Sequence, residues 1–380
     1  MKTDPVPEMH RHLFPAKGSG AHDLLTVLLG AEHAAREAWD RWQKSHDFDT
    51  LDAANHRLLI MALPTLSRYG LPVIDRPRLQ GLARRTFCTT MLQWNAVCEI
   101  SNLLGAEGIP IMIFKGLPLS VALYKPGERY AADADLLIRR SDYQRACAAF
   151  DRHQKMAHRH PDRVFNLAID NGEEWSLGPA QLDIHWRLCH EFTPQPGTEA
   201  KIWDRAHPIA GLPKGLSWVH PPLMPAPEDM LLQLAVSQTR WDRGPHGLVD
   251  IVKLLNDSGA DFDWDLLVEE AIAHRVSLRV AAVLDFVRQN FSAPVGRDQI
   301  NRLREEALAF ENEELKQIAN PTRWHLLRWY WFYFRRNESA GGIMPVNAIR
   351  FIWFMLKARG KKAPGIAAYY VRRALTDSAK

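Results

Sequence analysis

The chain has 380 residues, of which 46% are hydrophobic and 24% are charged, and its formal net charge is +4. These totals are typical of a globular protein and exclude an intrinsically disordered or collagen-like chain. The length suggests roughly two or three domains. The four scattered cysteines favour reduced thiols in a cytoplasmic protein over a disulfide scaffold. We find neither a signal peptide nor an apolar run near the roughly 18 residues of a membrane span.

Helices are predicted before a short α/β segment. Residues 21–105 space apolar side chains three and four apart, which is the pattern of helices with one buried face. Residues 109–114 and 132–139 are predicted strands, and residues 117–124 between them suit one or two helical turns. A further helix is predicted after Ser141, which would cap it.

The second half of the α/β segment leads into further helices. Asn171-Gly172 predicts a hairpin turn, and residues 180–186 alternate apolar and polar side chains as a strand does. Helical patterns return from residue 225. The fold class is therefore α+β, with a mixed sheet flanked by helical regions. We divide it into an N-terminal helical region, an α/β core, a linker, a second helical region and a basic aromatic C-terminal segment, at residues 1–105, 106–192, 193–224, 225–320 and 321–380.

Three aspartates are the candidate catalytic residues. Asp133 and Asp135 lie in one predicted strand, where residues i and i+2 share a face with Cβ atoms roughly 6 to 7 Å apart. Asp183 lies on the polar face of another predicted strand. Carboxylates on neighbouring strands suit hard divalent cations, so we predict that all three bind Mg²⁺, with Mn²⁺ as an alternative.

The Asp-x-Asp spacing also has a plainer interpretation. It recurs at Asp47 and Asp49, and again between Asp261 and Asp265, where it precedes helical patterns and is typical of helix caps in solvated turns. The strand context of Asp133 and Asp135 favours the metal interpretation there.

Four further residues are predicted to bind the nucleotide. Lys115 and Gly116 follow the first strand, where backbone N–H groups and an ammonium can hold phosphate; the alternative is a plain turn with the lysine in solvent. Arg129 could reach the same phosphates or pair with Glu128. His185 could orient a water or the acceptor group, or it could be a partly buried histidine bonded to a backbone carbonyl.

The C-terminal segment is basic and aromatic. From residue 321 onward, twelve Lys or Arg side chains accompany only Glu338 and Asp377 as acids. Terminal helices packed on the body with basic side chains outward would explain this composition. Contact with nucleic acid or with an anionic membrane surface would explain it as well.

Taken together, the stretches GIPIMIFKGLPLSVALY, ERYAADADLLI and QLDIHWRL resemble the uncharacterised nucleotidyltransferase family of the polymerase-β-like superfamily. In that family a Lys-Gly turn, an arginine before paired aspartates and a later Asp-x-His-Trp recur in this order. The resemblance covers roughly residues 50 to 300 and implies a minimal nucleotidyltransferase core that uses Mg²⁺.

The chain departs from its relatives at two places. The wider superfamily carries Gly-Ser in the turn where this chain has Lys115 and Gly116, which implies a different detail of triphosphate binding. In the helix after the core, where relatives often have histidine, this chain has Ser237 and Gln238.

The resemblance implies transfer of an NMP group from an NTP, with ATP the expected donor, and release of pyrophosphate. The acceptor stays open between a peptide, a glycan intermediate, a protein and RNA. Two alternatives are a catalytically silent nucleotide-binding or scaffold protein in a biosynthetic cluster, and an RNA-binding module that acts through residues 321–380.

Overall fold

The computed structural model describes residues 13–158, 172–189, 198–209, 211–240, 244–319 and 331–332. The predicted basic aromatic segment therefore lies outside the described residues, apart from 331–332. The same holds for Asn171 of the predicted hairpin.

The N-terminal helices form as the apolar spacing predicts, with a break where Gly30 ends the first of them. Their bounds are Gly20–Leu29 (α2), Glu32–Ser45 (α3), Ala53–Arg68 (α4) and Arg76–Ala106 (α5), with a 3-10 turn at Phe48–Thr50 (η1). Asp47 caps this turn by accepting from the backbone N–H of Asp49 at 2.9 Å, so the plainer interpretation of that Asp-x-Asp copy is confirmed.

The α/β core contains a mixed sheet. In the described part of the chain, seven strands form one sheet in the order β3-β4-β5-β2-β1-β7-β6. The strands are Met112–Phe114 (β1), Ala134–Leu137 (β2), Met156–His158 (β3), Gly172–Leu177 (β4), Ala180–His185 (β5), His207–Pro208 (β6) and Leu223–Met224 (β7). Strand β2 runs antiparallel to β1 and parallel to β5. The α+β prediction is confirmed.

Side-chain alternation gives the sheet two different faces. Ile113, Leu136 and Ile184 belong to a core that includes residues of α5 and of Tyr143–Arg152 (α7). Met112 and Leu137 belong instead to the larger core of the helical regions. Because neighbouring residues of a strand point to opposite faces, polar side chains in register with Leu137 face the helical regions.

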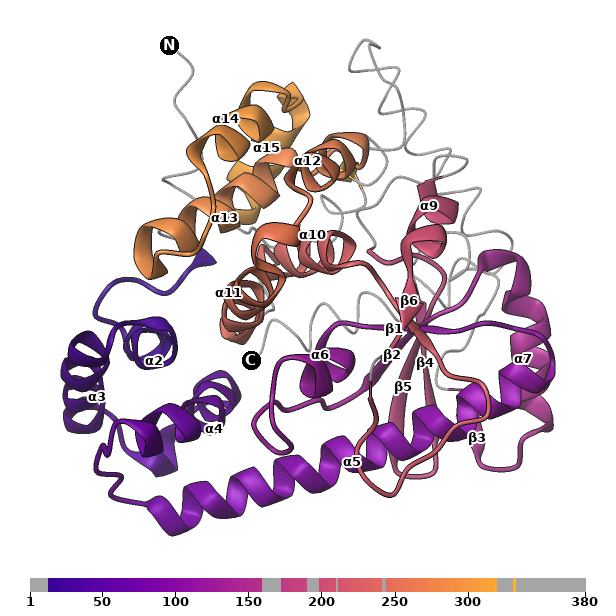
Figure 1. The fold of residues 1–380 in the computed structure, drawn as a ribbon, viewed down its shortest axis with the longest axis horizontal. Helices are drawn as coiled ribbons and strands as arrows, with labels where there is room; N and C mark the ends of the chain where they lie inside the picture. The colour runs from indigo at the N-terminus through magenta and orange to yellow at the C-terminus, as the bar shows by residue number, and fades with distance from the viewer. Residues whose placement is uncertain are drawn as a thin grey trace.

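The C-terminal helices complete the fold. They are Thr198–Arg205 (α9), Pro227–Gln238 (α10), His246–Ser258 (α11), Trp264–Ala273 (α12), Ser277–Phe291 (α13), Arg297–Glu305 (α14) and Ala309–Ala319 (α15), with a 3-10 turn at Gly259–Asp261 (η3). Asp263 caps α12 by accepting from Leu266 N–H at 2.9 Å, as expected for this second Asp-x-Asp run. In Figure 1, α5 extends from the N-terminal helices along the sheet, while α10 and α11 lie between those helices and the sheet. None of the described helices is both long and apolar enough to cross a membrane.

Two local expectations were wrong, and the predicted linker contains more regular structure than expected. Gly172 pairs with His185 inside the β4–β5 ladder, and the turn between these strands is at residues 178–179. Ser141 lies within the 3-10 turn Arg140–Asp142 (η2), which precedes α7, rather than at the cap of that helix. The predicted linker, residues 193–224, contributes α9 and the strands β6 and β7, and β7 pairs with β1. The domain boundaries as a whole stay a prediction.

Candidate active site

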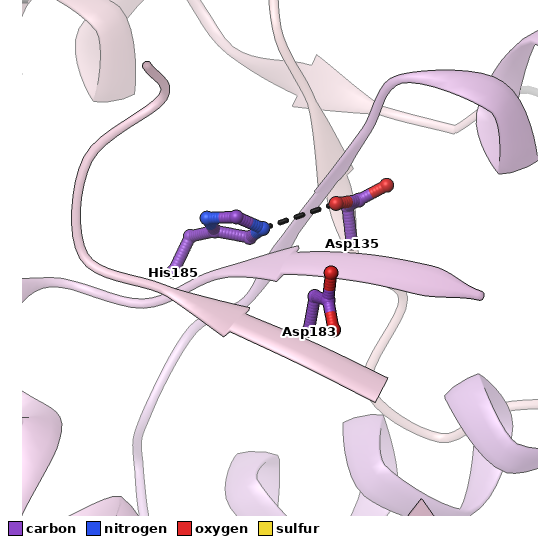
Figure 2. Close-up of side chains that lie close together, drawn as sticks. All are labelled: Asp135, Asp183 and His185. Carbon is purple, nitrogen blue, oxygen red and sulfur yellow. Dashed lines mark hydrogen bonds and ion pairs between the residues drawn. The ribbon is translucent and has the colours of Figure 1, made fainter. Parts of the chain in front are cut away.

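Two carboxylates face each other across neighbouring strands. Asp135 of β2 and Asp183 of β5 are direct partners in the parallel ladder. His185, two residues further along β5, donates from Nε2 to Asp135 Oδ1 at 3.0 Å, and Figure 2 shows the three side chains together. One ligand atom from each residue lies within 4.8 Å of the others. The parallel register therefore brings Asp135 and Asp183 together, as the sequence predicts for these two aspartates.

Asp133 lies in the bend just before β2 rather than within the predicted strand 132–139. Strand β2 begins at Ala134, and its last partner on β1 is Phe114, opposite Asp135. Two residues further, the partner of Asp133 would be Gly116, which already belongs to the helix Gly116–Ala122 (α6). On the β1 side, the pairing therefore ends before residue 133. Asp133 lines the same cavity as the acidic group, in the bend before the strand.

Lys115 supplies the positive charge closest to this group. Its ammonium forms an ion pair with Asp135 Oδ1 and lies 3.5 Å from His185 Nε2. The residue has φ 60° and ψ −131°, a conformation that L residues rarely adopt. Such strain is typically maintained at functional sites and costs about 1–3 kcal/mol. The interpretation of Lys115 as a residue in plain solvent is therefore wrong.

The two carboxyl groups are shifted in opposite directions. Burial raises the pKa of Asp135, but the charge of Lys115 and the hydrogen bond from His185 outweigh burial and hold it well below its usual range. Burial and then the charge of Asp135 raise the pKa of Asp183 to about 7. Asp135 is thus held as an anion. Asp183 is partly buried, and the repulsion between the two carboxyl groups is expressed in its raised pKa.

Arg129 is held by a residue that the sequence analysis did not single out. Its guanidinium makes a bidentate pair with Asp250 of α11, with Nε–Oδ1 at 2.9 Å and Nη2–Oδ2 at 2.7 Å. Tyr124 donates its hydroxyl to the same carboxylate at 2.7 Å, and Arg129 also donates to the backbone oxygen of Tyr130. The structure therefore pairs Arg129 with Asp250 rather than with Glu128, and this pair joins the α/β core to α11.

Two glycines leave room for functional side chains. A Cβ atom on Gly116 would lie 3.1 and 3.3 Å from the guanidinium nitrogens of Arg129. A Cβ atom on Gly172 would lie 2.6 Å from Nδ1 of His185, its partner across the ladder. Glycine at these positions allows the arginine and the imidazole to approach the backbone closely.

A cavity of about 160 Å³ brings these residues together. Its wall includes the predicted site residues Lys115, Gly116, Arg129, Asp133, Asp135 and Asp183. His185 does not line the cavity itself, but it is hydrogen-bonded to Asp135, which does. The helical regions contribute the side chains that the sequence analysis missed, namely Arg57 of α4, Gln233 of α10 and Asp250 of α11. Ser237 and Gln238 of α10 also line the wall.

Sequence signals for the missed residues are weak. Asp250 is a single acid among the apolar residues of GLVDIVKLL, and a lone buried charge on an apolar helix face indicates a partner elsewhere in the fold. Nothing local identifies Arg57 or Gln233, because both reach the cavity only through the packing of the helical regions on the core.

The donor set fits a divalent cation. Asp135 and Asp183 offer carboxylate oxygens of the kind that Mg²⁺ and Mn²⁺ prefer, and the imidazole of His185 suits Mn²⁺ better than Mg²⁺. The hydrogen bond from His185 to Asp135 also suits an orienting role for the histidine behind a carboxylate ligand.

The α+β fold and the paired carboxylates are those expected of a nucleotidyltransferase. The family model described as "Uncharacterised nucleotidyltransferase" matches residues 47–292. The chain belongs to this family, which supports nucleotide transfer as its general activity. A search of curated proteins found no match.

Proposed function

We propose that this protein is a Mg²⁺-dependent nucleotidyltransferase that moves an NMP group from an NTP, with ATP the expected donor, onto an acceptor hydroxyl or phosphate. The acceptor would be a peptide, a glycan intermediate, a protein or RNA. The observation that carries the proposal is the direct pairing of Asp135 with Asp183 on parallel strands, in the wall of a cavity that also contains Lys115.

Asp135 and Asp183 would hold the cation, with Asp133 beside them in the same wall. A bound divalent cation would supply neutralisation of the charge that develops on the phosphates during transfer. His185 keeps Asp135 oriented through its hydrogen bond. Asp183 is more exposed than Asp135, which suits it to accept the proton of the attacking acceptor group.

Lys115 and Gly116 would contact the triphosphate. The ammonium lies at the cavity wall, and the backbone N–H groups that open α6 follow it directly. In the proposed reaction, an acceptor oxygen forms a bond to the α-phosphorus, the bond from that phosphorus to the bridging oxygen breaks, and pyrophosphate leaves. Arg129 is committed to Asp250, so its proposed contribution is a positive charge at the wall and a fixed position for Gly116.

A thermal-shift experiment tests the proposal without knowledge of the acceptor. Wild type and the Asp135→Ala/Asp183→Ala variant are melted with ATP, GTP, CTP or UTP, each with and without Mg²⁺. We expect wild type to be stabilised by ATP only when Mg²⁺ is present, and the variant to show no such shift. The control is Asp47→Ala/Asp49→Ala, which alters a capping Asp-x-Asp and should keep the shift.

An unchanged nucleotide shift in Asp135→Ala/Asp183→Ala would contradict the proposed site. No shift of wild type with any nucleotide would favour the scaffold alternative. The RNA-binding alternative depends on residues 321–380, of which the structure describes only 331–332.

A further inference from the structure

One part of the cavity wall consists of neutral amide and hydroxyl groups. Gln233, Ser237 and Gln238 all come from α10, in the helical region that packs over the carboxylate-bearing face of the sheet. Gln238 donates from Nε2 to the backbone oxygen of Gly244 at 3.2 Å, so this amide is used to hold the start of α11. Gln233 is used differently.

The amide of Gln233 is only half satisfied. The residue is 1% exposed, and its Nε2 donates to Ser237 Oγ at 2.8 Å. Its Oε1 is buried and has no hydrogen-bond partner among the residues that the structure describes. A buried acceptor without a hydrogen-bond partner is unfavourable. A ligand that donates a hydrogen bond to Oε1 would remove this cost.

With Nε2 bonded to Ser237, the group of Gln233 that is left for a ligand is Oε1, which suits a hydrogen-bond donor rather than a phosphate oxygen. Oε1 only accepts hydrogen bonds, and ionised phosphate oxygens also only accept, so the two would repel. The donors of a magnesium-bound ATP are the amino group of adenine and the ribose hydroxyls. Ser237 Oγ accepts a hydrogen bond from Gln233, so its own hydroxyl proton is left to donate. The wall therefore offers an acceptor, Gln233 Oε1, beside a donor, the Ser237 hydroxyl. The edges of adenine and of cytosine offer the complementary pair, an amino group beside a ring nitrogen. Adenine is the base of the donor that the proposed function expects.

We propose that Gln233, supported by Ser237, recognises adenine in the bound nucleotide and makes ATP the preferred donor. The inference rests on the proposed function, because it names the base that the same cavity accepts. Lys115 and the bound cation would hold the phosphates, and the neutral side chains of α10 in the same wall would select the base.

Titration calorimetry in the presence of Mg²⁺ tests this assignment on the full chain. The ligands are ATP, purine riboside triphosphate, which differs from ATP only by the missing amino group, 2′-deoxy-ATP and inorganic tripolyphosphate. The proteins are wild type, Gln233→Met and the control Gln299→Met. Gln299 of α14 also has a buried, unpartnered Oε1 among the described residues but is absent from the cavity wall.

We expect wild type to bind ATP about tenfold more tightly than purine riboside triphosphate, as one hydrogen bond predicts. In Gln233→Met this ratio should fall to near one while the affinity for tripolyphosphate stays unchanged, and Gln299→Met should behave as wild type. These results would support the assignment.

Several results would overturn it. The first is a ratio near one between the affinities of wild type for ATP and for purine riboside triphosphate, a result that does not depend on any variant folding. The second is an unchanged ratio in Gln233→Met. The third is an equal loss of affinity for ATP and for tripolyphosphate in that variant. Dependence on the 2′-hydroxyl in place of the amino group would assign Gln233 to ribose and also overturn the proposal. Wild type that binds no nucleotide would instead overturn the proposed function itself.

Discussion

The buried pair between Arg129 and Asp250 gives the sharpest stability prediction. Asp250 is fully buried, Arg129 is 7% exposed, and the carboxylate accepts two charged hydrogen bonds from the guanidinium and one from Tyr124. Asp250→Ala would leave the guanidinium buried without its counter-ion. Breaking a buried ion pair from one side typically costs about 3–5 kcal/mol. We therefore expect a loss of about that size in the free energy of unfolding, measured by urea denaturation with tryptophan fluorescence.

The double variant Arg129→Met/Asp250→Leu separates the penalty of an unpaired charge from the loss of packing. Because both charges are removed, we expect it to be more stable than Asp250→Ala. The control is Asp49→Ala, which breaks an exposed pair with Arg78 and should leave the free energy of unfolding nearly unchanged. A loss below about 1 kcal/mol for Asp250→Ala would refute the reasoning, as would a double variant no more stable than the single one.

Three further predictions concern the turn at the cavity and the pH dependence of the same pair. Lys115→Gly and Lys115→Met both remove the ammonium, so both should lose nucleotide affinity in calorimetry. In urea denaturation the glycine variant should be more stable than the methionine variant by about 1–3 kcal/mol, because glycine accepts a positive φ. Equal stability of the two variants would argue against backbone strain at this position. Gly116→Ala forces a Cβ atom against the guanidinium of Arg129 and should cost about 1–3 kcal/mol, whereas Gly81→Ala, which has nothing within 4 Å of its Cβ position, should cost nothing in the same denaturation assay. Burial raises the pKa of Asp250, but the charge of Arg129 outweighs it and lowers the pKa below its ordinary value, so this carboxylate stabilises the fold above the unfolded pKa of about 3.9 and the benefit is lost as pH falls further. The stability difference between wild type and Asp250→Asn should therefore shrink below about pH 4, and a difference that grows on acidification would contradict the pairing.

Local sequence patterns predicted the part of the site that lies on the sheet. The apolar runs located β1, β2 and β5, and the alternation in β5 placed Asp183 and His185 on one polar face. The parallel pairing of β2 and β5 then brought Asp135 opposite Asp183. Asp133 falls outside the predicted strand because strand length depends on the partner: β1 ends at Phe114, and its pairing with β2 does not continue to residue 133.

The remainder of the site depends on contacts between distant parts of the chain. Arg129 and Asp250 are 121 residues apart, and no short-range pattern connects them. The strained backbone also falls on Lys115 rather than on Gly116, although glycine accepts such angles more readily. Here the glycine has a different role, since a Cβ atom would lie only 3.1 and 3.3 Å from the guanidinium nitrogens of Arg129. Such requirements arise from tertiary packing and cannot be deduced from local sequence.

The measurement that most directly tests the central claim is a Mn²⁺ titration followed by electron paramagnetic resonance, with and without ATP. Wild type is compared with Asp135→Asn/Asp183→Asn, which keeps the shape of both side chains and removes their charge. We predict that wild type with ATP binds Mn²⁺ more tightly than ATP alone does and that added Mg²⁺ displaces it, whereas the variant binds no more than the free nucleotide. Equal Mn²⁺ binding by wild type and variant would contradict the assignment of these two aspartates as the cation site.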